Sequence, residues 1–458
     1  MNFSLPAFWL SLFSGLTVIW LLTRLIRQDS AHRWLLAALS LTLLGLESAL
    51  TLAVFLFVFS VTYLALRWLA RQEKSPPLFI ALVVVLQFLP LLFFKYGNFL
   101  TSQVFNEAPG LLRDLIIPVG LSFYTFQMVG LLVDTVKDRL PLPSFLNCLN
   151  FASFFPQIVA GPIERRSNLL PQMERFRFQL DWNSVERGVR WIILGLFMKL
   201  TLAENIAAES AAVTIDPGNP FLVWLECLFF SFRIYNDFAG YSFIAYGIAT
   251  ALGVKLTLNF LSPYWTTNFR DFWRHWHVSL SQWFRDYLYI PLGGNRSTWK
   301  PALILLVFAA SGIWHGAGWN FVLWGALHGL LVLLPPWEKF RIPKPLAWGL
   351  HLSLVAFTWL FFFERDSALL FEKVTTLLNP MTYSPEHLKA IMSAFPNKSA
   401  MIASGAILAL CALAVGLEGF SLKKPYALLT HRFTCLVMIV LIYLFQPATY
   451  HEFIYFNF

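Results

Sequence analysis

Long apolar runs, separated by short polar and basic linkers, recur from one end of the chain to the other. Runs of roughly 20 residues or somewhat fewer let a helix cross the hydrocarbon core of a bilayer. We expect about a dozen such helices, near residues 7–25, 34–48, 50–66, 78–94, 115–133, 188–206, 220–236, 302–314, 319–334, 346–363, 398–419 and 432–446. The pattern predicts an all-α, polytopic membrane protein with one integral membrane domain over residues 1–458.

Two stretches need closer interpretation. The block Trp34–Leu66 is long enough for two short spans that turn near Glu47, which places the basic linkers on either side of it in the cytoplasm. Phe145–Gly161 carries polar residues and Pro156 and has basic flanks on both sides, so we expect a re-entrant segment.

The composition agrees with a membrane protein, because 57% of the 458 residues are hydrophobic and only 13% are charged. The net charge of +9 comes largely from the basic linkers. Such linkers are typical of cytoplasmic loops, so the expected partner is the lipid bilayer and not a nucleic acid. The four cysteines lie in or beside apolar runs and are interpreted as buried thiols.

One apolar run carries an unusual stripe of polar side chains. Glu226, Arg233, Asp237 and Tyr241 follow one another at spacings of seven, four and four residues, which places them on one helical face. Arg233 and Asp237 can satisfy one another there. Either the stripe lines a polar pathway, or it forms a structural ion pair that fixes helix packing.

The histidines fall into two groups. Five lie near basic, polar or terminal stretches and are interpreted as interfacial residues: His32, His351, His387, His431 and His451. The other four lie in tryptophan-rich apolar sequence: His275, His277, His315 and His328. Ionisable groups at membrane depth usually mark chemistry or a polar pathway.

The spacing of these four histidines does not favour a metal site. His275 and His277 are two residues apart and would point in different directions from a helix. His315 and His328 are thirteen apart, about 220° around an ideal helix, so they cannot share a face of one unbroken helix. We therefore expect no metal site.

His328 has the most distinctive setting of the four. Gly325 and Gly329 flank it as a pair of small residues that lets a neighbouring helix approach closely. A neutral imidazole held there can take a proton near neutral pH. The alternative is a buried histidine that is hydrogen-bonded to a backbone carbonyl.

Five motifs resemble the membrane-bound O-acyltransferase family, in particular its bacterial branch of alginate O-acetyltransferases and related proteins that acetylate exopolysaccharide, cellulose and peptidoglycan. They are "IIPVGLSFYTFQ" at Ile116–Gln127, "FFPQIVAGPIER" at Phe154–Arg165, "NDFAGYS" at Asn236–Ser242, "NFRDFWRHWHVSLSQWFRDYLYIPLGGNR" at Asn268–Arg296 and "WHGAGWNFVLWGALHG" at Trp314–Gly329. The resemblance implies a helical bundle around a central tunnel. It also implies that His328 is the signature histidine and His277 the second prominent one.

Acetyl transfer from a thioester to a sugar hydroxyl needs a base for the hydroxyl proton and a group that stabilises the oxyanion. We hypothesise that His328 is the base, while His277 orients the acyl donor or shares the proton load. The residues expected to line the tunnel or to serve structure are Asp237, Tyr241, Trp314, His315 and Trp324. For the tryptophans, helix packing and interfacial anchoring are the alternative roles.

The expected donor is acetyl-CoA or an acyl carrier thioester, with no cofactor held permanently. Residues of the basic segments within and at the end of the motif Asn268–Arg296 can meet the phosphates of that donor: Arg274, Arg285, Asn295 and Arg296. The positive-inside rule explains the same arginines without any ligand.

The resemblance therefore predicts a multi-pass protein of the bacterial inner membrane that acetylates an extracytoplasmic polysaccharide together with a periplasmic acetyltransferase. Three alternatives stay open: an O-acyltransferase that acts on a lipid or a protein, a transporter, and a non-catalytic scaffold. The charges do not recur in two symmetry-related halves, which argues against a transporter built from inverted repeats.

Overall fold

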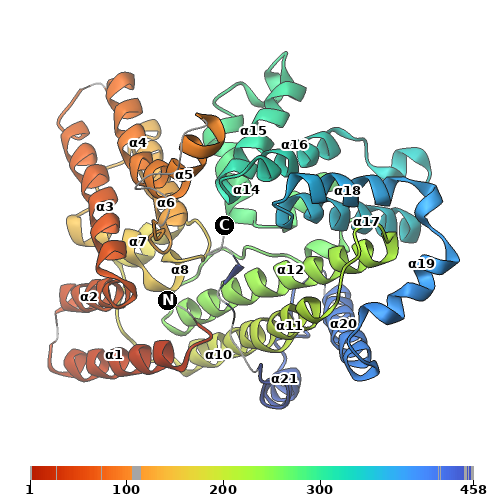
Figure 1. The fold of residues 1–458 in the computed structure, drawn as a ribbon. Coiled ribbons are helices and arrows are strands. Elements are labelled where there is room, and N and C mark those ends of the chain that lie inside the picture. Colours follow the sequence, from red (N-terminus) through yellow and green to blue (C-terminus); the bar gives the residue numbers. More distant parts are fainter. Residues whose placement is uncertain are drawn as a thin grey trace. The chain divides into compact units, whose positions relative to one another are not determined.

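The computed structural model describes residues 3–26, 28–73, 75–105, 115–420, 422, 424–447, 451, 453 and 454, and its elements are helices (Figure 1). These residues form two compact units. Unit 1 comprises Met1–Ile192, Tyr241–Leu258 and Arg285–Tyr287, and unit 2 comprises Ile193–Gly240, Asn259–Phe284 and Leu288–Phe458. The expectation of a single domain stays a prediction.

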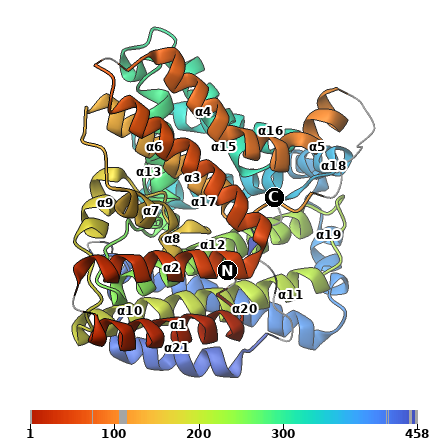
Figure 2. The ribbon, with the colours of Figure 1, turned by 90° about the vertical axis from the view of Figure 1, so that its left-hand side faces the viewer.

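Unit 1 holds most of the N-terminal helices. They are α1 Pro6–Leu25, α2 Asp29–Glu47, α3 Ala49–Leu69, α4 Pro77–Leu91, α5 Gly97–Phe99, α6 Leu121–Lys137, α7 Phe145–Ser153, α8 Phe155–Ile158 and α9 Arg166–Glu174. Helices α1 and α2 run side by side, and α3 packs against both α4 and α6 (Figure 2).

Unit 2 holds the remaining helices, apart from α10 Trp182–Leu196 and α12 Pro220–Ala251, which extend from one unit into the other. They are α11 Glu204–Ala212, α13 Phe269–His275, α14 Val278–Phe284, α15 Lys300–His315, α16 Trp319–Leu333, α17 Lys344–Phe363, α18 Ser367–Leu378, α19 Pro385–Ala390, α20 Lys398–Gly419 and α21 Arg432–Leu444.

Six helices in the described part of the chain are long and apolar enough to cross a membrane. They cover Pro6–Leu25, Ala49–Leu69, Pro77–Val104, Trp182–Ala212, Lys344–Phe363 and Lys398–Gly419. Three shorter apolar helices are α15, α16 and α21. All nine coincide with predicted spans, which confirms the helical membrane fold, whereas the count of about a dozen and the central tunnel stay predictions.

The predicted turn near Glu47 is confirmed, and its cause is local. Ser48 adopts an extended conformation between α2 and α3, and its hydroxyl accepts a hydrogen bond from the backbone N–H of Thr51 at 2.9 Å. A serine in this position satisfies an N–H group that has no partner within the helix.

The predicted span at residues 115–133 begins too early, because α6 starts only at Leu121. Gly120 has φ 76° before it, a conformation that favours glycine. A Cβ atom on Gly120 would also lie 2.5 Å from the carbonyl oxygen of Ile158. The stretch Phe145–Gly161 is divided into the short helices α7 and α8 by Phe154, which agrees with a segment that does not cross the membrane.

Helices α15 and α16 form a hairpin in unit 2, and their labels lie together in Figure 1. A Cβ atom on Gly325 would lie 2.2 Å from the carbonyl oxygen of Phe308, and one on Gly312 would lie 2.1 Å from that of Phe321. The close approach predicted from the glycines around His328 is therefore confirmed, and the neighbouring helix is α15.

Candidate active site

His328 lies on α16 with its side chain fully buried, at 0% exposed. The indole N–H of Trp273 on α13 donates a hydrogen bond to His328 Nδ1 at 3.3 Å. His328 Nε2 has no hydrogen-bond partner among the described residues. The expected alternative, a ring bonded to a backbone carbonyl, is therefore not what the structure shows.

Aromatic rings enclose this imidazole. Its centroid lies 4.8 Å from Trp324, 5.1 Å from Trp273 and 6.2 Å from Phe272, whose ring is nearly parallel to it. Such a shell excludes water and gives the ring few polar neighbours. A proton on this imidazole therefore has few acceptors nearby other than a bound reactant.

His277 lies in the break between α13 and α14, where the chain takes φ 41°. A non-glycine residue in this region costs roughly 1–3 kcal/mol, so the surroundings must hold it in place. The backbone N–H of Val278 donates to the Asn259 carbonyl at 2.9 Å, and that of Ser279 donates to the Asn259 side chain at 3.3 Å. Burial lowers the pKa of His277 below its usual range, which keeps the ring neutral.

A row of rings runs between these two histidines within unit 2. The His277 ring lies 6.3 Å from His315 and 5.6 Å from Trp314. His315 packs edge-on against Trp324 at 5.1 Å, and Trp324 in turn packs against His328. The structure therefore brings His277, His315, Trp314, Trp324 and His328 into one buried aromatic cluster, with His277 and His328 at its opposite ends.

His275, in contrast, serves local structure. It is the last residue of α13, and its Nδ1 lies 2.7 Å from the backbone carbonyl of Asp271, four residues earlier. Its own carbonyl accepts a hydrogen bond from the N–H of Leu261 at 3.0 Å.

The interpretation of His351 as an interfacial residue is wrong, because its side chain is fully buried on α17. Its Nε2 lies 3.1 Å from the hydroxyl of Thr266, and its ring packs 4.6 Å from Phe269, which also contacts His328. A signal for this burial exists in the sequence. Most buried positions of α17 repeat at helical spacing, namely Ala347, His351, Val355, Thr358, Trp359 and Phe362, and Leu360 is buried as well.

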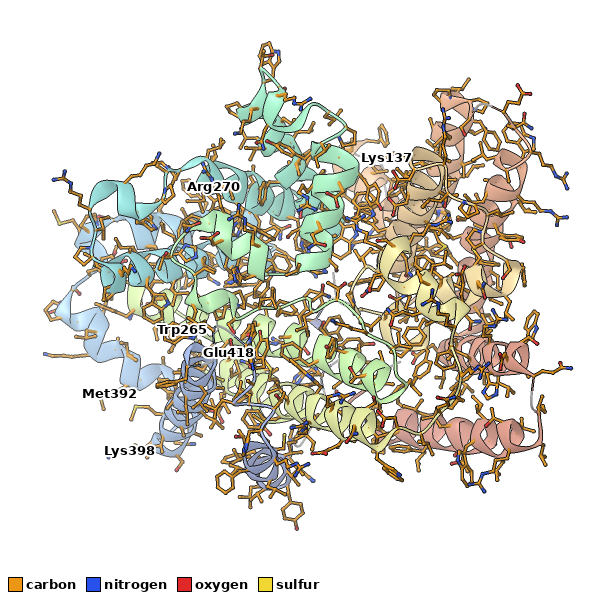
Figure 3. All side chains as sticks on the ribbon, turned by 180° about the vertical axis from the view of Figure 1, so that it is seen from behind. Lys137, Trp265, Arg270, Met392, Lys398 and Glu418 are labelled. Atoms are coloured by element: carbon orange, nitrogen blue, oxygen red, sulfur yellow. The ribbon has the colours of Figure 1, made fainter. Side chains whose placement is uncertain are left out.

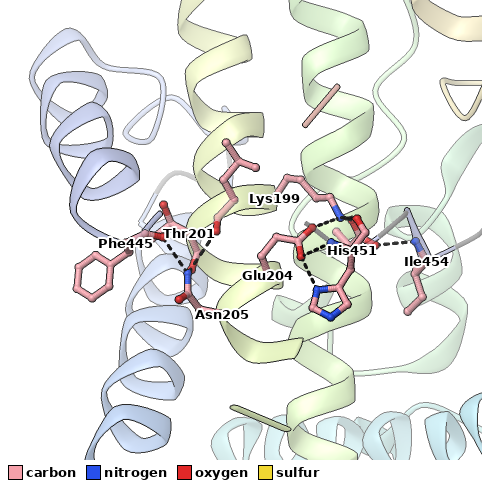
Figure 4. Close-up of polar contacts among 9 residues, drawn as sticks. Lys199, Thr201, Glu204, Asn205, Phe445, His451 and Ile454 are labelled. Carbon is pink, nitrogen blue, oxygen red and sulfur yellow. Dashed lines mark hydrogen bonds and ion pairs between the residues drawn. The ribbon is translucent and has the colours of Figure 1, made fainter. Parts of the chain in front are cut away.

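Asp237 pairs with a partner that was not predicted from the sequence. Lys199 Nζ lies 2.8 Å from Asp237 Oδ1 and 2.6 Å from Glu204 Oε1, so the ion pair of Asp237 is with Lys199 and not with Arg233 as predicted (Figure 4). The remaining oxygens of the two carboxylates bind backbone, because Asp237 Oδ2 accepts from the N–H of Ile454 at 2.8 Å and Glu204 Oε2 from that of His451 at 2.9 Å. These contacts agree with the structural interpretation of the stripe.

The other members of the stripe also have partners in protein. Glu226 pairs with Lys373 at 2.8 Å in unit 2. Tyr241 stacks on Phe3 at 4.3 Å in unit 1. Neither contact tests the predicted role of Tyr241 in lining a tunnel.

Glu418 is a further buried carboxylate that was not predicted from the sequence. Glu418 lies near the end of α20 beside Trp265 (Figure 3) and is 1% exposed. The hydroxyl of Tyr235 donates to Glu418 Oε1 at 2.8 Å and lies 3.1 Å from the hydroxyl of Tyr426. The indole N–H of Trp265 donates to the Val415 carbonyl at 2.6 Å, which ties this end of α20 to the loop before α13.

The residues expected to bind the acyl donor lie at the surface. The Arg274 side chain is 75% exposed and forms an ion pair with Asp271 at 2.8 Å. Asn295 and Arg296 are exposed on a short turn, and Asn295 Oδ1 accepts a hydrogen bond from the hydroxyl of Tyr289 at 3.0 Å. Arg285 belongs to unit 1, where it pairs with Asp286 at 2.7 Å.

Two further observations bear on the chemistry of the cluster. No group of three or more His, Cys, Asp or Glu side chains in the described ranges is arranged to hold a metal ion. The donors and acceptors that the cluster does offer are ring nitrogens, in an otherwise apolar surrounding. Such a site is suited to moving a proton on a bound, largely neutral reactant.

Residues 18–337 match the family model of the membrane-bound O-acyltransferases. The chain is 34% identical over 351 residues to a peptidoglycan O-acetyltransferase of Helicobacter pylori, a match that covers 67% of this chain and 66% of that protein. It is 33% identical over 310 residues to a probable alginate O-acetylase of Azotobacter vinelandii, covering 64% and 61%. It is 29% identical over 300 residues to a teichoic acid D-alanyltransferase of Bacillus subtilis, covering 61% and 74%.

The chain thus spans about two thirds of the length of the first of these relatives and somewhat less of the second. The family match covers the motifs that carry the buried histidines His277, His315 and His328. With six helices in its described part that can cross a bilayer, the chain is a multi-pass membrane protein and belongs to the membrane-bound O-acyltransferase family.

Proposed function

We propose that this protein moves an acetyl group from a cytoplasmic thioester to hydroxyl groups of an extracytoplasmic polysaccharide, in the inner membrane of a bacterium. The family and the names of the relatives support this assignment. Those names describe the transfer of an acetyl or a D-alanyl group to peptidoglycan, alginate or teichoic acid.

The observation that carries the proposal is the setting of His328. Its imidazole is buried in an aromatic shell, bonded to protein at Nδ1 and unpartnered among the described residues at Nε2. In the reaction, the acceptor hydroxyl oxygen bonds to the acyl carbon, the carbon–sulfur bond breaks, and the hydroxyl proton passes through His328 to the departing thiolate. A positioned base of this kind contributes roughly 10²–10⁴-fold to a rate.

His277 supports the reaction from the other end of the aromatic row, by orienting the acyl donor or sharing the proton load. Trp314 and Trp324, which pack against His277 and His328 respectively, keep water from the thioester. His315 joins the two ends of the row through Trp324, and its role is to hold that indole in place.

The proposed donor is acetyl-CoA or an acyl carrier protein. Both present phosphate oxygens, and exposed arginines such as Arg274 and Arg296 suit such groups. A periplasmic acetyltransferase is the proposed partner that completes transfer to the polysaccharide.

D-alanyl is a second acyl group that the protein is tested for in parallel. The relative from Bacillus subtilis is named a D-alanyltransferase, and the match covers 74% of its length. An aminoacyl donor would use the same proton transfer at His328, because only the substituent of the acyl group differs. Membranes that contain the protein are therefore incubated with labelled acetyl thioester or with labelled D-alanyl thioester in separate assays. The polymer that becomes labelled is identified in each assay.

The central experiment uses purified protein in lipid vesicles, labelled acetyl-CoA and a polysaccharide acceptor. We expect His328→Ala to lose at least about 100-fold in transfer while its thermal midpoint stays close to wild type. His431→Ala, at the exposed histidine that directly precedes α21, is the matched control and should retain activity. Full transfer by folded His328→Ala would remove His328 from the mechanism, and label in lipid or protein would redirect the acceptor assignment.

A further inference from the structure

Trp273 and His328 form a buried pair that the hypothesis of a simple histidine base does not explain. The two rings meet edge to face at 5.1 Å and 85°, and the indole N–H points to His328 Nδ1 at 3.3 Å. Trp273 is 8% exposed and His328 is 0% exposed, so water does not compete for this hydrogen bond. The pair joins α13 to α16 across 55 residues of sequence.

The chemistry of the two groups fixes the position of the imidazole proton. An indole N–H donates a hydrogen bond and cannot accept one, so Nδ1 must present its lone pair. A neutral imidazole with a lone pair on Nδ1 carries its proton on Nε2. In the structure as it stands, the ring therefore has one basic nitrogen, and Trp273 covers it.

The position of Trp273 is itself well determined. Asn268 caps the start of helix α13, and its side chain accepts a hydrogen bond from the N–H of Asp271 at 2.9 Å. The indole packs 5.3 Å from Phe308 on α15 and 5.7 Å from Trp324 on α16. Trp273 is thus held against both helices of the hairpin that carries His328.

We propose that Trp273 is a positioning residue that holds His328 in the Nε2–H tautomer and covers its basic nitrogen until the acceptor hydroxyl takes the place of the indole N–H. This inference rests on the proposed acyl transfer. The hydroxyl then gives its proton to Nδ1 as its oxygen bonds to the acyl carbon, and Nδ1 returns that proton to the thiolate that leaves.

The consequence is selectivity for the acceptor over water. A water molecule that attacks the thioester must also give a proton to Nδ1, and the covering indole opposes this. The net value of one hydrogen bond corresponds to roughly two- to tenfold in a rate. Trp273 therefore slows hydrolysis of the thioester by a factor of this size. A well-bound acceptor displaces the indole N–H from Nδ1, because its other contacts with the protein compensate for the lost hydrogen bond.

The first test is spectroscopic and does not depend on activity. Protein with ¹⁵N-labelled histidine is prepared in detergent, and the His328 signals are assigned by their loss in His328→Gln. We expect the wild-type ring to carry its proton on Nε2. A proton on Nδ1 in the wild type would overturn the proposal, whether or not any Trp273 variant folds.

The second test compares Trp273→Phe with Trp276→Phe. Trp276 is a fully buried neighbour whose indole N–H has no partner among the described residues, so its replacement removes an N–H without touching His328. Trp273→Phe should shift the His328 tautomer and raise acetyl-CoA hydrolysis in the absence of acceptor about two- to tenfold, and Trp276→Phe should change neither. Unchanged tautomer and hydrolysis in folded Trp273→Phe would show that Trp273 only packs.

These outcomes separate the two proposals. If folded His328→Gln still transfers acetyl, the proposed role of His328 in catalysis fails, whereas the tautomer observed by NMR is unaffected. If His328→Gln is inactive and Trp273→Phe leaves hydrolysis unchanged, the proposed function stands and the role of Trp273 is refuted.

Discussion

Replacing Gly325 with alanine tests the close approach of α15 and α16 that positions His328. The new Cβ atom would lie 2.2 Å from the carbonyl oxygen of Phe308 and 3.0 Å from its carbonyl carbon. Backbone atoms cannot turn aside as a side chain does, so α16 must move from α15 by about 1 Å to restore a normal contact. Overpacking of this kind costs roughly 1–3 kcal/mol.

The assay is thermal unfolding of the detergent-solubilised protein, where we expect the midpoint to fall by several degrees. Gly416→Ala is the matched control, because a Cβ atom on this glycine of α20 meets nothing within 4 Å. Alanine there is expected to be neutral or to stabilise the helix by up to about 1 kcal/mol. The midpoint of Gly329→Ala should lie between the midpoints of these two variants, since the nearest atom to its new Cβ belongs to the Leu305 side chain, at 3.1 Å. Equal midpoints for Gly325→Ala and Gly416→Ala would refute the close contact between the helices.

Two other changes test the charged groups. Lys199→Met leaves the buried carboxylates of Asp237 and Glu204 without their cation and should destabilise the protein by roughly 3–5 kcal/mol, measured by thermal unfolding against Lys389→Met at an exposed site. If Lys199→Met is as stable as that control, the ion pairs do not hold the segment at His451. Removing Arg274 and Arg296 together should leave the midpoint unchanged, since exposed ion pairs contribute little. The same double variant should raise the KM for acetyl-CoA with kcat preserved, and an unchanged KM would exclude both arginines from the donor site.

The helices were the most predictable part of the fold, because an apolar run of sufficient length is a local property of the sequence. The turn at Ser48 and the close packing at Gly325 likewise depend on short-range signals, a helix cap and a pair of glycines. The start of α6 was missed because Gly120 is constrained by Ile158, a residue 38 positions further along the chain.

The partners of the site residues were less predictable, since they come from distant parts of the chain. Trp273 lies 55 residues before His328, and Lys199 lies 38 residues before Asp237. Helical spacing within one segment favoured Arg233 as the partner of Asp237, yet the neighbouring helix supplies a lysine. His351 was misjudged for a related reason, because basic residues precede it in the sequence and much of the start of α17 is exposed, yet its own side chain lies on the buried face of the helix.

His315 and His328 lie in the same cluster because the chain turns between them. On an unbroken helix, thirteen residues would separate the two rings by about 220°. The chain instead turns between α15 and α16, where Gly316 is required because a Cβ atom would lie 2.0 Å from the Phe321 ring. The turn folds the two helices back on each other, so both imidazoles pack against the indole of Trp324. His328 is consequently held between two tryptophans with different tasks: Trp324 links it to the rest of the row, and Trp273 determines which of its nitrogens is basic.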